Sequence, residues 1–161
     1  MNTYDFDQCI YDGNCTLDFF RFCLRRQLGL IRYLPRQIWG LVQYALGFIN
    51  RTVFKECFFC FLQGVQGLDD TLEAFWQQHF DRISPWYIAR KRQNDLIISA
   101  SPTFLLMPCC ERLLVKQLIA SRVNPATGAF TGENCYGAEK PKRLMEDLGI
   151  GAVGEFYSDS L

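Results

Sequence analysis

Two carboxylates near the N-terminus have a spacing that suggests chemistry. Asp5 and Asp7 lie two residues apart, at the end of a short run, Thr3 to Phe6, that is typical of a β-strand. Side chains alternate between the two faces of a strand, so both carboxylates point the same way. At the carboxyl end of the strand, where open α/β sheets bind ligands, such a pair suits Mg²⁺. It can equally supply one nucleophile and one proton carrier.

Further polar residues occur where later strands end or helices begin. Ser99 ends the apolar run 95–99, where its hydroxyl and the backbone N–H of Ala100 can hold a phosphate oxygen. Lys140 stands at the start of an expected helix, and Asp159 follows an expected strand. A nucleophile, a hydroxyl, an ammonium group and a third acid therefore follow one another in chain order.

The elements that must position these residues are indicated by the change of apolar period along the chain. Residues 15–93 carry helical signals only, whereas later residues include short apolar runs. Helices are expected at 16–27, from Pro35, at 52–63, from 69 or 70 to 83, from Ser84-Pro85, from Ser101-Pro102 and at 141–148. Strands are expected at 3–6, 95–99, 118–123 and 152–157. A strand, a helical insertion and then alternating strands and helices predict an α/β fold.

Four motifs in this order resemble those of the haloacid dehalogenase superfamily of phosphatases. The family pattern Asp-x-Asp-x-Thr/Val is similar to Asp5–Cys9, and an apolar strand ending in Ser or Thr is similar to 97–102. The third and fourth motifs look like 134–140, which ends in Lys140, and 157–161, which contains Asp159. The helical insertion resembles the cap of the branch that includes phosphoserine phosphatases.

This resemblance covers the whole chain and implies a fold and a division into domains. The fold is a Rossmann-like parallel sheet flanked by helices, with an α-helical cap inserted after the first strand. Residues 1–14 and 94–161 would form the core, and residues 15–93 the cap. The chain stops two residues after Asp159, before a second acid of the last motif, so the C-terminal part of the core is expected to be missing.

The resemblance also implies a role for each motif residue. Asp5 would attack phosphorus and form an aspartyl-phosphate, while Asp7 would act as general acid and then general base. Ser99, Ala100 and Lys140 would bind the phosphoryl oxygens. Mg²⁺ would be held by Asp5, the Asp7 main-chain carbonyl and Asp159. The implied function is Mg²⁺-dependent hydrolysis of a small phosphomonoester, and the alternative is a truncated, inactive domain with a binding role only.

Two departures from the family pattern concern the first motif and the substrate. Cys9 stands where the family has Thr or Val, and its similar volume predicts little effect on catalysis. Asn14 stands where phosphoserine phosphatases carry a Glu that recognises the substrate amine, so phosphoserine is not the expected substrate.

Composition narrows the expected partners and location. Lys plus Arg and Asp plus Glu each number 17, so no net charge attracts nucleic acid. The eight cysteines are unevenly spaced and no signal peptide is apparent, which predicts a cytoplasmic protein with reduced thiols. The apolar run 38–49, flanked by arginines, fits a buried helix or contact with a membrane surface. The oligomeric state is not indicated.

Two tempting alternatives have simpler structural interpretations. Cys57 and Cys60 have metal-ligand spacing, and Cys109 and Cys110 could complete a zinc site, but the first pair lies in an apolar helical run. Cysteines in such a run behave as small apolar side chains. His79 lies in an amphipathic helical segment, where a packing or surface role is expected.

Overall fold

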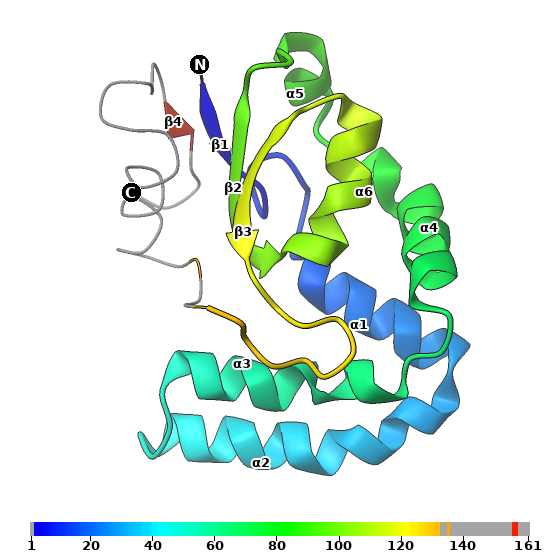
Figure 1. Cartoon of the computed structure of the whole chain (residues 1–161), viewed down its shortest axis with the longest axis vertical. Helices are drawn as coiled ribbons and strands as arrows, with labels where there is room; N and C mark the ends of the chain where they lie inside the picture. Colours follow the sequence, from blue (N-terminus) through cyan, green and yellow to red (C-terminus); the bar gives the residue numbers. More distant parts are fainter. Residues whose placement is uncertain (1, 133–134, 136–155, 158–161) are drawn as a thin grey trace.

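Four parallel strands form a single sheet in the order β3–β2–β1–β4 (Figure 1). The computed structural model describes residues 2–132, 135 and 156–157. The strands are β1 (Thr3–Asp5), β2 (Leu96–Pro102), β3 (Gln117–Ser121) and β4 (Phe156–Tyr157). Thr3 pairs with both Leu96 and Phe156, so β1 lies between β2 and β4. This sheet and its flanking helices confirm the predicted α/β fold.

The strand order places a change of direction next to β1. From β1 the chain moves outward through β2 to β3, and β4 then pairs on the opposite side of β1. Sheets of this topology bind ligands beyond the carboxyl ends of the strands, beside such a switch point. Asp5 is the last residue of β1 and therefore reaches this edge.

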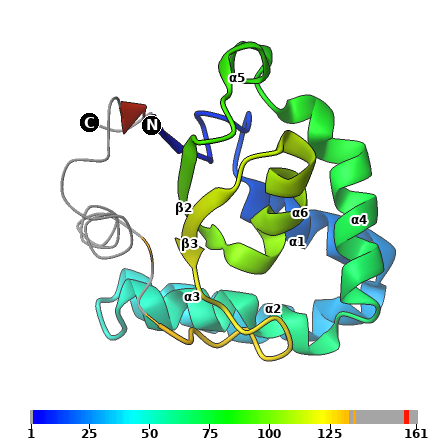
Figure 2. The same cartoon turned by 45° about the horizontal axis from the view of Figure 1, so that its top comes forward.

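The stretch between β1 and β2, which is described throughout, contains five α-helices and three 3₁₀ helices. They are α1 (Cys15–Arg26), η1 (Leu28–Tyr33), α2 (Leu34–Ala45), α3 (Arg51–Phe59), η2 (Cys60–Gly64), α4 (Leu68–His79), η3 (Phe80–Arg82) and α5 (Pro85–Arg90). A further helix, α6 (Thr103–Leu113), connects β2 to β3. Helices α1, α4 and α6 lie on the same side of the sheet (Figure 2).

Alternation along the strands divides the apolar side chains between the two faces of the sheet. Tyr4 and Ile97 join the large core cluster formed with α1, α4 and α6. Leu96 and Ile98 point to the other face and pack with Ile119. In the larger cluster Trp76 is fully buried, and its indole N–H donates to the carbonyl of Leu105 at 2.7 Å.

The α2–α3 hairpin, residues 34–59, extends beyond the sheet at the bottom of Figure 1. Its two helices approach closely at Gly40, where an added Cβ would lie 2.5 Å from Cβ of Cys57. The Tyr44 ring stacks on Phe54 with ring centroids 5.0 Å apart, and the Gln37 amide donates to the carbonyl of Phe58 at 2.7 Å. These contacts hold the two helices together as one unit.

The boundaries of several elements differ from the sequence predictions. The helix expected at 16–27 begins at Cys15 and is capped by Asn14, whose side chain accepts the N–H of Leu17, while the Thr16 hydroxyl donates to Ser101. Strand β2 continues to Pro102 instead of ending at Ser99, with an irregularity in its pairing to β3 between Ile98 and Pro102. The helix expected at 52–63 becomes a 3₁₀ helix after residue 59.

Predictions near the C-terminus fall mainly outside the described residues. The helix expected at 141–148 lies there entirely. Of the strand expected at 152–157, the structure describes Phe156 and Tyr157, which form β4.

Candidate active site

Asp5 lies buried at the carboxyl end of β1. It pairs with Ile98 of β2, and its side chain is shielded from solvent, with 6% of the residue exposed. One carboxylate oxygen accepts the N–H of Phe6 at 2.9 Å. The first acid of the predicted pair is therefore oriented by the backbone where the strand ends.

The chain turns sharply after Asp5 and places Asp7 in a tight loop. The carbonyl of Phe6 accepts the N–H of Ile10 at 2.9 Å and of Tyr11 at 2.8 Å. The N–H of Gln8 donates to the carbonyl of Tyr11 at 2.9 Å, and Gln8 adopts a positive φ of 63°. The backbone on either side of Asp7 is thus fixed by hydrogen bonds.

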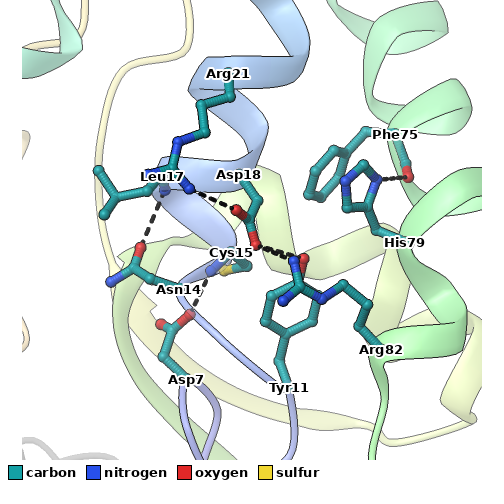
Figure 3. Close-up of polar contacts among 10 residues, drawn as sticks. All are labelled: Asp7, Tyr11, Asn14, Cys15, Leu17, Asp18, Arg21, Phe75, His79 and Arg82. Atoms are coloured by element: carbon teal, nitrogen blue, oxygen red, sulfur yellow. Dashed lines mark hydrogen bonds and ion pairs between the residues drawn. The ribbon is translucent and has the colours of Figure 1, made fainter.

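The Asp7 carboxylate collects three hydrogen bonds from two other elements. One oxygen accepts the N–H of Cys15, at the start of α1, at 2.7 Å (Figure 3). The other accepts the hydroxyl of Ser101 at 2.7 Å and that of Ser99 at 3.3 Å. A carboxylate can accept about four hydrogen bonds, so room for one more partner is left. The structure therefore brings Asp7 and Ser99 together, as the sequence predicts.

Ser99 and Ala100 lie within β2, at the irregularity in its pairing, and not after the strand. Ser99 is fully buried, and its hydroxyl oxygen also accepts the N–H of Ser101 at 3.0 Å. The carbonyl of Ala100 accepts the ammonium of Lys55 and the hydroxyl of Ser121, each at 3.0 Å. This stretch of β2 therefore links Asp7 to both α3 and β3.

The other predicted site residues, Lys140 and Asp159, lie outside the described part of the chain. Within residues 2–132, 135 and 156–157, no three His, Cys, Asp or Glu side chains gather as a metal-binding group. The donors present at the end of β1 are oxygens, the carboxylate of Asp5 and the carboxylate and carbonyl of Asp7. Such donors fit a hard cation such as Mg²⁺.

Sequence reasoning missed the support that Ser101 and α1 give to Asp7. Besides donating to Asp7, the Ser101 hydroxyl accepts from the hydroxyl of Thr16 at 2.9 Å and from the thiol of Cys15 at 3.4 Å. The signal was present, since Ser101 follows Ser99 by two residues and strand residues so spaced share a face. Burial, and then the negative charge of Asp7, raise the pKa of Cys15 far above its usual value. Cys15 is therefore a thiol that donates a hydrogen bond.

A cavity of about 240 Å³ opens beside these residues. Its polar lining includes Asp7, Asn14, Lys55 and Ser101. Its apolar lining comes from α1 and α3 and consists of Leu17, Phe54, Phe58 and Phe59. No sequence signal marks Lys55, whose place in the cavity follows from how α3 packs against the edge of the sheet.

Asp18 joins the loop after β1, helix α1 and η3 (Figure 3). Its carboxylate accepts the Tyr11 hydroxyl at 3.0 Å and pairs with Arg82 at 2.8 Å and Arg21 at 3.3 Å. Burial and the adjacent Asp18 charge raise the pKa of Tyr11 well above its usual value, so Tyr11 stays a neutral donor. His79 stacks on Phe75, which fits the packing role expected from the sequence.

The cysteines considered for zinc are free thiols in apolar surroundings. Cys57 and Cys60 lie on α3 and η2, and Cys109 and Cys110 lie on α6. Burial raises the pKa of Cys110 to about 12, so this side chain stays protonated and uncharged at neutral pH. This environment agrees with their interpretation as small apolar side chains.

Comparisons with known proteins give matches that extend over almost the whole chain. The family model described as haloacid dehalogenase-like hydrolase matches residues 3–161. A protein of unknown function from Bordetella pertussis Tohama I has a similar structure, with a TM-score of 0.74 and 15% identity, covering 98% of this chain and 80% of that one. A phosphoserine phosphohydrolase-like protein from Francisella tularensis subsp. tularensis SCHU S4 has a TM-score of 0.53 and 14% identity, covering 98% and 77%.

No curated protein matches the sequence. The two solved structures, at their low identity, support the fold, and the family model covers almost every residue. The chain therefore belongs to the haloacid dehalogenase-like hydrolase family.

Proposed function

We propose that this protein is a Mg²⁺-dependent phosphatase that hydrolyses a small phosphomonoester through an aspartyl-phosphate. The proposal rests mainly on one arrangement: Asp5 ends β1, and Asp7 follows it with hydrogen bonds to Ser99 and Ser101 of the adjacent strand. The fold shared with a phosphoserine phosphohydrolase-like protein supports it further. Asn14 and the apolar cavity wall favour a substrate other than phosphoserine.

The proposed reaction has two steps that use the same pair of carboxylates. An Asp5 oxygen attacks phosphorus, the bond from phosphorus to the leaving oxygen breaks, and Asp7 gives that oxygen a proton. A water molecule then attacks phosphorus and gives a proton to Asp7. The bond between Asp5 and phosphorus breaks, which releases inorganic phosphate and restores both side chains.

The phosphoryl group is held by polar groups from the core. The Ser99 hydroxyl, the Ala100 N–H and the Lys140 ammonium bind its oxygens and balance the charge that develops during transfer. Asp5, the Asp7 carbonyl and Asp159 would hold Mg²⁺, which when bound offsets the repulsion between the carboxylate and the phosphoryl oxygens.

In this proposal residues 15–93 form the cap, and residues 1–14 and 94–161 form the core. The cap residues that line the cavity lie on α1 and α3, and Asn14 of the core lines it beside them. Helices α1 and α4 also pack in the same apolar cluster as the sheet. The α2–α3 hairpin contributes only Phe59 to the buried residues of that cluster. It is therefore the part of the cap that can shift over the cavity with least loss of core packing, to exclude water and select the substrate.

Hydrolysis of an aryl phosphate with and without divalent metal tests the proposal. We expect turnover with Mg²⁺, a decrease of at least about a hundredfold with excess chelator, and recovery when Mg²⁺ is restored, because the metal supplies several kcal/mol of charge stabilisation. If no hydrolysis is detected with Mg²⁺ across a panel of phosphomonoesters, the proposal is wrong. That result would favour the alternative of a domain with a binding role only.

Lys55 is proposed to bind the substrate from the cap side of the cavity. Its ammonium lines the cavity and donates to the carbonyl of Ala100, beside the proposed phosphate site. We expect Lys55→Met to raise KM about tenfold with a smaller change in kcat, because a charge-assisted hydrogen bond contributes about 1.5–3 kcal/mol.

Lys91→Met is the matched control for this variant. Lys91 also donates to a backbone carbonyl, that of Leu113 at 2.7 Å, but it is not among the residues that line the cavity. Its loss should leave KM unchanged. Equal KM values for the two variants would show that Lys55 supports the fold and does not contact substrate.

A further inference from the structure

In the described part of the chain, most of the exposed large apolar side chains belong to residues 28–53. Trp39 is 63% exposed and Phe48 is 76% exposed. The exposed apolar residues of this segment are Leu28, Ile31, Ile38, Trp39, Leu41, Val42, Leu46, Phe48 and Val53. Isolated exposed apolar residues are ordinary, but a contiguous group marks a surface that binds something.

Helix α2 concentrates this exposure on its outer face. Ile38, Trp39, Val42 and Leu46 recur at spacings of three and four residues and are all exposed. Gln37 and Gly40, by contrast, are buried, with Gln37 bonded to α3 and Gly40 against Cys57. We call the exposed side, with Phe48 of the following turn, the outer face of α2. Figure 1 shows α2 on the far side of α3 from the sheet.

Every charged residue between Phe19 and Lys55 is basic. Residues 19–55 contain seven basic and no acidic side chains, although the whole chain has equal numbers of each. Arg32 and Arg36 lie near the first residues of α2. Arg51, the first residue of α3, donates to the hydroxyl of Tyr44 near the C-terminal end of α2. All three arginines are exposed. An apolar face with basic residues at both ends complements a surface that is apolar within and anionic outside.

Helix length decides how this face can meet such a surface. The 12 residues of α2 extend about 18 Å, whereas a bilayer core is about 30 Å thick. None of the helices described is long and apolar enough to cross a membrane. The helix can lie in the plane of the interface, with its outer face in the acyl boundary.

A second copy of the chain is a poorer occupant of the same face. A two-fold contact brings the same patch of both copies together, so the basic ends of one would face those of the other without an acidic partner in 19–55.

We propose that the outer face of α2 docks the protein on an anionic membrane surface. Helix α3, which contributes residues to the cavity lining, then lies between that surface and the sheet.

Co-sedimentation of the whole chain with lipid vesicles tests this proposal independently of any catalytic activity. We expect binding to vesicles that contain phosphatidylglycerol and much weaker binding to vesicles of phosphatidylcholine alone. Raising the salt from about 0.1 M to about 1 M should also weaken binding, because the screening length falls from about 10 Å to about 3 Å. Trp39→Gln with Phe48→Gln should lower the affinity at least about tenfold.

Met107→Gln is the matched control, since Met107 is 50% exposed on α6, away from the hairpin, and its loss should leave binding unchanged. Arg32→Gln with Arg36→Gln gives a second test, with weaker binding that depends less on salt. The proposal is overturned if the wild-type chain does not bind anionic vesicles, or if the Trp39/Phe48 variant binds as well as Met107→Gln. Self-association that the Trp39/Phe48 variant abolishes, without vesicle binding, would assign the face to a second copy.

Discussion

Replacing Asp5 by Asn is expected to abolish phosphatase activity, with a loss of about 10⁴-fold or more. The amide keeps the size of the side chain and an oxygen that can accept the N–H of Phe6, so the end of β1 should keep its structure. It cannot act as the oxygen nucleophile, and no aspartyl-phosphate can form. Steady-state hydrolysis of an aryl phosphate measures the loss, and acid quenching with labelled substrate measures the covalent intermediate.

Asp7→Asn is the informative comparison for this variant. Asp7→Asn should lower phosphatase activity roughly 10²–10⁴-fold, the range for loss of a general acid and base. The decrease should be smaller for an aryl phosphate than for an alkyl phosphate, because an aryl oxygen needs less protonation to leave. Labelled intermediate should still form with Asp7→Asn but not with Asp5→Asn. Wild-type levels of labelled protein in Asp5→Asn would exclude Asp5 as the nucleophile.

Replacing Trp76 by Ala is expected to lower the free energy of unfolding by about 3–5 kcal/mol. Trp76 is fully buried, and its ring meets Phe6 and Tyr11 edge to face, with centroids 6.1 and 5.9 Å away. Its N–H also donates to the carbonyl of Leu105 on α6. One side chain therefore joins α4, α6 and the loop that carries Asp7. Because domains are stable by about 5–15 kcal/mol, urea titration should show a much lower midpoint.

Trp86→Ala provides the control for the size of the side chain. Trp86 is 39% exposed, so its removal creates a smaller buried cavity than removal of Trp76. We therefore expect a clearly smaller decrease in the free energy of unfolding. Trp76→Phe should fall between the two, since it keeps apolar contact but leaves the Leu105 carbonyl without its donor. If Trp86→Ala were as destabilising as Trp76→Ala, the central packing role of Trp76 would be wrong.

The sequence was sufficient to predict the sheet and the part of the candidate site that depends on strand period. Asp5, Asp7 and Ser99 follow from short apolar runs and their polar ends, and parallel strands bring such ends to one edge. The role of Ser101 is not predicted because the polar Ser99 is read as the end of the strand. Ser99 and Ser101 nevertheless have the spacing of residues on one strand face, and β2 continues to Pro102.

Contacts between distant segments were beyond prediction from local pattern. Lys55 reaches Ala100 only because α3 lies against the edge of the sheet, and nothing in the residues around Lys55 indicates this. The first residue of α1 is likewise not decided by local pattern, because Asn14 and Thr16 are both good capping residues. In the structure Asn14 caps the helix, and the Thr16 hydroxyl donates to Ser101 of the distant strand β2.

The position of β1 in the sheet has a consequence for synthesis of the protein. Both strands that pair with β1 follow it in the chain, and the nearer one, β2, comes after all the helices of residues 15–90. At translation rates of about 5–20 residues per second, β1 waits roughly 5–20 s for its first partner. The three-residue strand that carries Asp5 is therefore exposed on the nascent chain while the α2–α3 hairpin can already form. During this interval chaperones and proteases at the ribosome can reach the segment on which the proposed catalysis depends.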